Sequence, residues 1–328
     1  MRYLSREALK ASLDAKETAR NDAAVDRALE AASRAVESLV RRSFHPWVGT
    51  HRYDYPGSSY RLELDDWLAD MDALSSGGVS ISTSDVVLYP DDGPPYRRLE
   101  LDKGTSSSFD IGDTDQQAIA VTGTWGWSLD SVAAGSLAEA LDDSETGVDV
   151  SDSSGIGVGD LLLVDSEWLE VTGRSMLSTA QTNTTPLTAT MTDNIVTVTT
   201  GSAFHSGEVL LLGAEKVFVD EIAGNSLTVR RAWDGTTLAA HTGATIYAPR
   251  TLTVVRGAVG STAASHLTST ALTRWTAPGD VVALVQAEAE AILLGSSSGW
   301  SKDRSTALDD LRRRVYETYA NRCRTEAI

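Results

Sequence analysis

Hydrophobic residues recur at helical spacing near the N-terminus of the chain. A first, short stripe consists of Leu4, Ala8, Leu9 and Leu13, with Ser5 as a candidate N-cap. After a polar break at Glu17–Asn21, a longer stripe predicts a helix from about Asp22 to Arg42. Its members are Val25, Leu29, Ala32, Val36, Leu39 and Val40. Arg41 and Arg42 suit the C-terminal end of the helix dipole, and Pro46 ends the helical pattern.

The pattern then changes to short runs that are typical of strands. Residues 50–64 contain two alternating runs around a Pro-Gly turn. Four more candidate strands follow, at Gly78–Ser82, Val86–Tyr89, Tyr96–Leu101 and Gln117–Thr122. Turn-forming residues separate these runs, and no helical pattern lies between them. The spacing therefore predicts antiparallel β-structure and not βαβ units.

An internal repeat occupies the next part of the chain. Residues 148–171 align with 196–219 at an offset of 48, which matches Gly159 with Gly207, Asp160 with Glu208 and Glu167 with Glu215. Residues 227–243 align with 252–268 at an offset of 25, which matches Arg231 with Arg256, Gly235 with Gly260 and His241 with His266. We interpret the two offsets as one small β-module, about 187–248, inserted into a loop of a second copy. A plain tandem with a duplicated strand-turn unit is the alternative.

The C-terminal part returns to a helical pattern. Pro278, Gly279 and Asp280 open a predicted helix that runs to Leu294. The sequence GSSSG at 295–299 predicts a break or hinge. A last helix from about Ser301 or Asp303 carries one apolar stripe, formed by Leu308, Leu311, Val315, Tyr319 and Cys323. Arginines decorate this helix, which therefore suits docking into a groove of a neighbour, although an ordinary packed terminal helix gives the same pattern.

The net charge of the 328 residues is −18, and it is unevenly distributed. Residues 1–45 have a net charge of +2, 46–136 of −10, 137–274 of −9 and 275–328 of −1. The acidic segments 46–136 and 137–274 argue against an extensive nucleic-acid-binding surface, because phosphate binding needs a basic surface. These acidic segments are expected to be a solvated surface that keeps the chain soluble, or a surface that must not bind DNA or that meets a basic partner. The N-terminus lacks the apolar run of a secretory signal, and no run is long enough to span a membrane.

Motifs that would carry catalysis or cofactor binding are absent from the sequence. The segment SGIGVG at 154–159 resembles a dinucleotide fingerprint, but no helix follows it, so we interpret it as a β-turn. The twice-copied His241 and His266 are expected to fill one structural position in each repeat and not to bind a metal. The single Cys323 is expected to pack on the last helix. The sequence predicts no enzyme, cofactor or metal site; a two-carboxylate hydrolase is a remote alternative.

Trp125 and Trp127 stand in the segment TGTWGW at the end of a predicted strand. Closely spaced aromatic residues beside glycines form intramolecular core contacts, interface anchors or sugar platforms. All three interpretations stay open from the sequence alone.

The order of these motifs resembles head–tail connector (adaptor) proteins of long-tailed double-stranded DNA bacteriophages. The resemblance begins with ALEAASRAVESLVRRSFHP (28–46) and THRYDYP (50–56). It continues through 61–74, 93–104 and AIAVTGTWGW (118–127), and returns in PGDVVALVQAEAEAILL (278–294). The modules between 130 and 274 are not part of this resemblance. Their sequences resemble small β-modules of other phage neck and tail proteins.

The resemblance implies an α+β fold with a helical core, built from the N-terminal and C-terminal helices, plus an antiparallel β region and inserted small β-modules. The expected domains are 1–46, 47–136, 137–274 and 275–328. The implied assembly is a ring, usually of twelve copies, below the portal protein, where it extends the DNA channel and binds the next neck protein, a head–tail stopper or tail terminator. DNA would pass through without specific binding. The implied location is the virion neck, reached from the host cytoplasm during assembly, with no membrane involved.

The last helix and the paired tryptophans are the expected portal or subunit interface. The residues are Arg312, Arg313, Arg314, Tyr316, Tyr319, Arg322, Arg324, Trp125 and Trp127. The alternative function is a neck or tail decoration module whose β-modules bind glycans, through Trp125 or Trp233, or a partner protein.

Overall fold

The computed structural model describes residues 1–13, 21–294 and 302–320. The chain divides into two compact units. One comprises residues 41–130 with 259–261, and the other comprises 1–40, 131–258 and 262–328. Most of the predicted polar break at 17–21, the predicted hinge at 295–299 and Cys323 lie outside the described residues.

The N-terminal helices follow the predicted hydrophobic stripes. Helix α1 spans Arg6–Ser12 and α2 spans Asp22–Val40. The Asn21 side chain caps α2, because its Oδ1 accepts a 2.8 Å hydrogen bond from the Ala23 amide. The helix ends where Arg41 adopts a φ of 61°, a left-handed conformation common just after a helix. Both predicted helices are confirmed, with the second ending two residues early.

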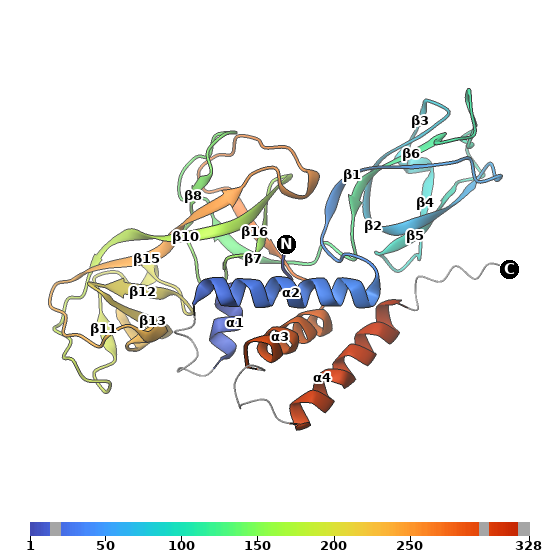
Figure 1. Cartoon of the computed structure of the whole chain (residues 1–328). Coiled ribbons are helices and arrows are strands. Elements are labelled where there is room, and N and C mark those ends of the chain that lie inside the picture. Colours follow the sequence, from blue (N-terminus) through green and yellow to red (C-terminus); the bar gives the residue numbers. More distant parts are fainter. Residues whose placement is uncertain (14–20, 295–301, 321–328) are drawn as a thin grey trace. The chain divides into compact units, whose positions relative to one another are not determined.

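Two helices follow the sheets. Helix α3 spans Gly279–Leu294, and α4 spans Lys302–Val315 before a π-helical turn at Tyr316–Ala320. The buried face of α2 packs on that of α3, and α4 packs on α3 (Figure 1). No helix in the described ranges combines the length and apolarity needed to cross a membrane.

The 41–130 unit is built on a six-stranded antiparallel sheet in the order β1-β6-β2-β5-β4, with β3 paired to β2. Its strands are β1 Trp47–Tyr53, β2 Arg61–Ser76, β3 Val79–Ile81, β4 Val86–Tyr89, β5 Tyr96–Leu101 and β6 Ile119–Trp125. Every second residue of β6 is buried, which is the period expected when one face of a strand covers a core. The antiparallel arrangement predicted from the turn spacing is confirmed.

The other unit contains a ten-stranded antiparallel sheet in the order β11-β14-β13-β12-β15-β10-β9-β16-β7, with β8 paired to β15. Its strands are β7 Ser131–Ser136, β8 Gly147–Asp149, β9 Leu161–Val164, β10 Glu167–Thr182, β11 Ile195–Thr197, β12 Val209–Leu212, β13 Glu215–Ala223, β14 Ser226–Arg230, β15 Thr245–Val255 and β16 Ala271–Trp275. The SGIGVG segment forms turns that lead into β9, with no helix after it.

Two separate hydrophobic cores lie along this sheet. One is made only of residues between Leu187 and Ala248. The other joins residues from both sides of that range, from Ala134 to Val171 and from Leu252 to Leu272. We call residues 177–248 the inner module, and residues 131–176, 249–258 and 262–275 the outer module. Strands β10 and β15 pair side by side and run from one module into the other (Figure 1).

The expected α+β fold with a helical core is wrong. The described chain is mostly β: the two sheets have six and ten strands, and only four α-helices accompany them. Three of the hydrophobic clusters are formed entirely by the strands and loops of the sheets. The resemblance gave the terminal helices too much weight, because it covered no part of residues 130–274, where the largest sheet forms.

The pairing of β10 with β15 predicts that the inner module can be removed while the outer module stays folded. Leu177 pairs with Ala248, so residues 178–247 can be replaced by an Asn-Gly turn that closes a two-stranded hairpin. We expect the shortened chain to keep a cooperative thermal transition, lowered by roughly 5–10 °C because Arg250 and Ser153 lose their contacts with the buried Glu208. Circular dichroism during heating measures this. Loss of the transition would show that the outer module needs the inner one to fold.

Candidate functional site

The predicted interface residues of the last helix lie on and just after α4. Arg312 forms an ion pair with Glu288 of α3, in which Nη2 donates to Oε2 at 2.8 Å. Tyr319 is buried, and its hydroxyl donates to Oδ1 of Asp280 at 2.6 Å. These two contacts attach α4 and its π-helical turn to α3. They make Arg312 and Tyr319 positioning residues and leave the rest of the helix to form an outer surface.

The outer surface of α4 is formed by Arg313, Arg314 and Tyr316, all of which are exposed. Arg313 pairs with Asp310 on the same helix at 3.0 Å, a solvated contact that contributes little to stability. Arg314 makes no ion pair with any residue that the structure describes. The predicted Arg322 and Arg324 lie outside the described residues. We call Arg313, Arg314 and Tyr316 the α4 surface.

Of the two predicted tryptophans, Trp125 belongs to the core of the 41–130 unit and Trp127 is half-buried. Trp125 is only 2% exposed, its Nε1 donates to the Gly49 carbonyl oxygen at 3.1 Å, and its ring stacks on His51 at 3.8 Å. Trp127 meets Trp67 edge to face, with 4.8 Å between ring centroids. Burial of Trp125 removes the ring face that a sugar would need, so the glycan interpretation loses this residue.

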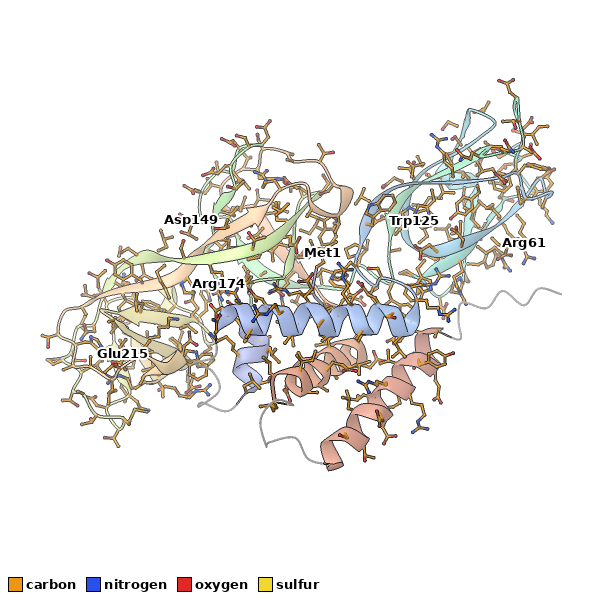
Figure 2. The ribbon with its side chains drawn as sticks, in the orientation of Figure 1. Met1, Arg61, Trp125, Asp149, Arg174 and Glu215 are labelled. Carbon is orange, nitrogen blue, oxygen red and sulfur yellow. The ribbon has the colours of Figure 1, made fainter. Side chains whose placement is uncertain are left out.

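The inner module contains a buried cluster around Glu215, which we call the inner Glu–Arg–His cluster (Glu215, Arg231 and His241; Glu215 is labelled in Figure 2). Arg231 donates to both carboxylate oxygens of Glu215, from Nε at 2.8 Å and from Nη2 at 2.9 Å. Nε2 of His241 donates at 2.8 Å, and the amides of Ala232 and Ala239 donate at 2.9 and 3.0 Å. Arg231 also donates to the carbonyl oxygens of Thr188, Asp193 and Ala239.

The outer module repeats this cluster contact for contact, in what we call the outer Glu–Arg–His cluster (Glu167, Arg256 and His266). Arg256 donates to Glu167 from Nε at 2.7 Å and Nη2 at 2.8 Å, and His266 donates from Nε2 at 2.9 Å. The amides of Gly257 and Ala264 donate at 2.9 and 3.0 Å. Arg256 also donates to the carbonyl oxygens of Asp142, Glu145 and Ala264.

These clusters hold loops together and offer little to a substrate. Each glutamate is fully buried and accepts five hydrogen bonds from its own module, which satisfies both oxygens. The two histidines occupy equivalent positions, as the offset of 25 predicts. The described residues contain no group of three histidine, cysteine or acidic side chains arranged to hold a metal ion.

The clusters predict a loss of stability in acid. Burial alone would raise the pKa of each glutamate, but hydrogen bonds from the arginine, the histidine and two amides outweigh it and lower the pKa of Glu167 and Glu215 to about 2. A lowered carboxylate pKa stabilises the fold above the unfolded value near 4.5, and this contribution is lost as the pH falls towards 2. We expect a loss of roughly 3 kcal/mol for each cluster between pH 5 and 2. Urea unfolding across this range measures it; a flat profile would contradict the assignment.

Sequence reasoning missed the acidic partners that position α4, namely Asp280 and Glu288. Glu288 lies in the run AEAEA and is buried among the apolar residues of α3. A carboxylate on a buried helical face requires a cationic partner, which could have been sought among the arginines of the last helix.

Comparisons with known proteins identify no relative: no protein-family model, curated protein or solved structure matches this chain.

Proposed function

We propose that this chain is a structural head–tail adaptor of a bacteriophage virion. In this function, about twelve copies form a ring below the portal protein, extend the DNA channel and bind the next neck protein. The chain works by occupying a position and by binding other proteins, without catalysis or a cofactor. It assembles in the host cytoplasm and ends in the neck of the virion.

The packing of α2 on α3 is the observation that carries the proposal. These helices contain most of the first and last segments of the resemblance, namely 28–40 of 28–46 and 279–294 of 278–294. The whole β-rich part of the chain lies between them in sequence. Their contact is apolar, with Val25, Leu29 and Val36 buried on α2 and Leu284 and Val285 buried on α3. An adaptor with insertions between its helices requires such a pair, because it must keep both ends of the insertions together.

The charge distribution supports the same function. The segments 46–136 and 137–274 have net charges of −10 and −9. Acidic surfaces do not release counterions from DNA and do not bind it, so DNA can move past them. A wall of a conduit and a solvent-facing decoration both fit this charge.

The α4 surface is the part of the chain that we assign to the portal contact. Its residues are exposed, cationic or aromatic, and carried by a helix that two partly buried contacts attach to α3. Arginine and tyrosine are enriched in protein interfaces because each combines a large contact area with hydrogen bonding.

Removal of the gene from the phage that encodes this chain tests the function. We expect DNA-filled heads and separate tails to accumulate, because the neck cannot be completed, and a plasmid copy of the gene should restore joined particles. Electron microscopy of the lysate distinguishes the outcomes. Particles that join their tails without the chain would contradict the proposal.

A further inference from the structure

A cleft of about 440 Å³ lies where α1 meets both β-modules, within one compact unit. Its volume is in the range of small-molecule sites. Apolar walls come from both modules and consist of Ile156, Val158, Met176, Val209, Phe218, Trp233 and Pro249. The cleft is therefore independent of the α4 surface and of the resemblance.

The charged lining of the cleft is more basic than acidic, although the whole chain has a net charge of −18. The five cationic residues are Arg6, Lys10, Arg174, Lys216 and Arg274, and the three acidic residues are Glu7, Asp22 and Asp234. Close ion pairs already neutralise some of the cations: Lys10 and Lys216 each lie 2.7 Å from Asp234. Arg174 and Arg274 do not have such close partners.

Arg174 and Arg274 leave most of their donors unused. The nearest carboxylate oxygen to Arg174 belongs to Glu7, 3.8 Å from Nη1, and that to Arg274 belongs to Asp160, 3.6 Å from Nη1. Arg174 donates one hydrogen bond, to the Ser153 carbonyl oxygen at 3.0 Å. The Nε atoms of both arginines are buried without a hydrogen-bond partner among the described residues. Figure 2 labels Arg174.

The same chain supplies a comparison for buried arginines. In the Glu–Arg–His clusters, Arg231 and Arg256 each donate five hydrogen bonds, to a carboxylate and to backbone carbonyl oxygens. A buried polar group without a partner is costly, and native structures usually avoid it. Arg174 and Arg274 differ from these two arginines, because most of their Nη donors remain open to an acceptor bound in the cleft.

Neither nearby carboxylate lies within hydrogen-bond distance of these arginines: Glu7 is 3.8 Å from Arg174 and Asp160 is 3.6 Å from Arg274. Glu7 already accepts a 2.7 Å hydrogen bond from the Val158 amide. Asp160 accepts one from Gly157, also at 2.7 Å, and its burial raises its pKa to about 6, although Arg274 and that amide act in the opposite direction.

We propose that the cleft binds a small organic anion, whose carboxylate or phosphate group is held by Arg174 and Arg274 and whose apolar part lies on the wall that includes Phe218 and Trp233. Guanidinium groups match both anions, because two parallel N–H donors can meet two oxygens of the same group. A small anion without an apolar part cannot make contacts with the apolar wall, so the full cleft favours an organic anion. The two anion types share this chemistry, so the test uses one probe of each.

Calorimetric titration of the full chain with phenyl phosphate, benzoate and uncharged benzyl alcohol, in a buffer without phosphate, tests the proposal. We expect at least one anion to bind, and the tighter one identifies the preferred group. Arg174→Met and Arg274→Met should each weaken binding at least tenfold, while their circular dichroism spectra stay unchanged. Arg61→Met is the matched control, because it removes an exposed arginine in the other unit, and it should leave binding unchanged.

Three results would overturn the proposal. They are no detectable binding of either anion at ~10 mM, binding of benzyl alcohol as tight as that of the anions, or folded Arg174→Met and Arg274→Met variants that bind as tightly as the parent chain. Arg174→Lys adds a further check. It keeps the charge but loses the planar pair of donors, so we expect binding between that of the parent chain and that of Arg174→Met.

Discussion

Glu215→Gln is expected to unfold the inner module at room temperature while the outer module stays folded. The substitution removes the negative charge from the inner Glu–Arg–His cluster and leaves Arg231, whose side chain has no solvent exposure, without a counterion. Breaking a buried ion pair in this way costs about 3–5 kcal/mol. This is comparable with the whole stability of a small domain, which is of order 5 kcal/mol.

Hydrogen exchange followed by mass spectrometry measures this effect module by module. Glu167→Gln is the matched variant, because it makes the same change in the outer cluster, where Asp165 remains 2.8 Å from His266. The inner core is formed by one continuous segment, so we expect it to keep its protection in Glu167→Gln. Equal protection of both modules in both variants would show that the clusters do not stabilise them separately.

Truncation after Ser301 is expected to abolish binding to the portal protein. It removes α4 with the α4 surface, and it frees Glu288 and Asp280 on α3 from Arg312 and Tyr319. Neither sheet receives a strand from this segment, so both should stay folded. Co-sedimentation with portal rings measures the binding, and circular dichroism checks the β-structure.

A double substitution separates the α4 surface from the presence of the helix. Arg313→Glu with Arg314→Glu reverses two exposed charges and leaves the Arg312 and Tyr319 contacts in place. We expect portal binding to weaken at least about tenfold, because the change removes two arginines from the proposed contact; a tenfold loss corresponds to about 1.4 kcal/mol. Arg230→Glu, which changes an exposed arginine of the inner module, is the control. Unchanged binding after truncation would place the portal contact elsewhere on the chain.

The hydrophobic pattern predicts the elements of this protein better than it predicts their proportions. A stripe at helical spacing locates α2, and the start at Pro278–Asp280 locates α3. Short runs between turn-forming residues locate β4 and β5 to the residue. The predicted α+β fold with a helical core was wrong, because the family resemblance was limited to 20–127 and 275–294. It gave no information about the ten-stranded sheet. Pattern alone also cannot show that β10 and β15 continue from one hydrophobic core into the next, since that depends on long-range pairing.

For the candidate sites too, the sequence shows which residues correspond in the two repeats but not which residues meet in space. The repeat matches Glu167 with Glu215, Arg231 with Arg256 and His241 with His266, but it does not show that each set meets around one carboxylate. That meeting depends on chain segments up to 99 residues apart, such as Glu167 and His266. Arg174 and Arg274 have no signal in the pattern, because their importance comes from hydrogen bonds that they do not make. Of the three interpretations that the sequence left open for Trp125, its burial supports an intramolecular core contact.

The mass of the complex that we propose this chain forms with a portal protein tests the proposed function most directly. Native mass spectrometry of the purified chain, mixed with portal rings from the same phage, gives the number of bound copies. We predict a complex that carries about twelve chains of 34.9 kDa on each portal ring. A chain that stays at 34.9 kDa beside unoccupied portal rings would contradict it.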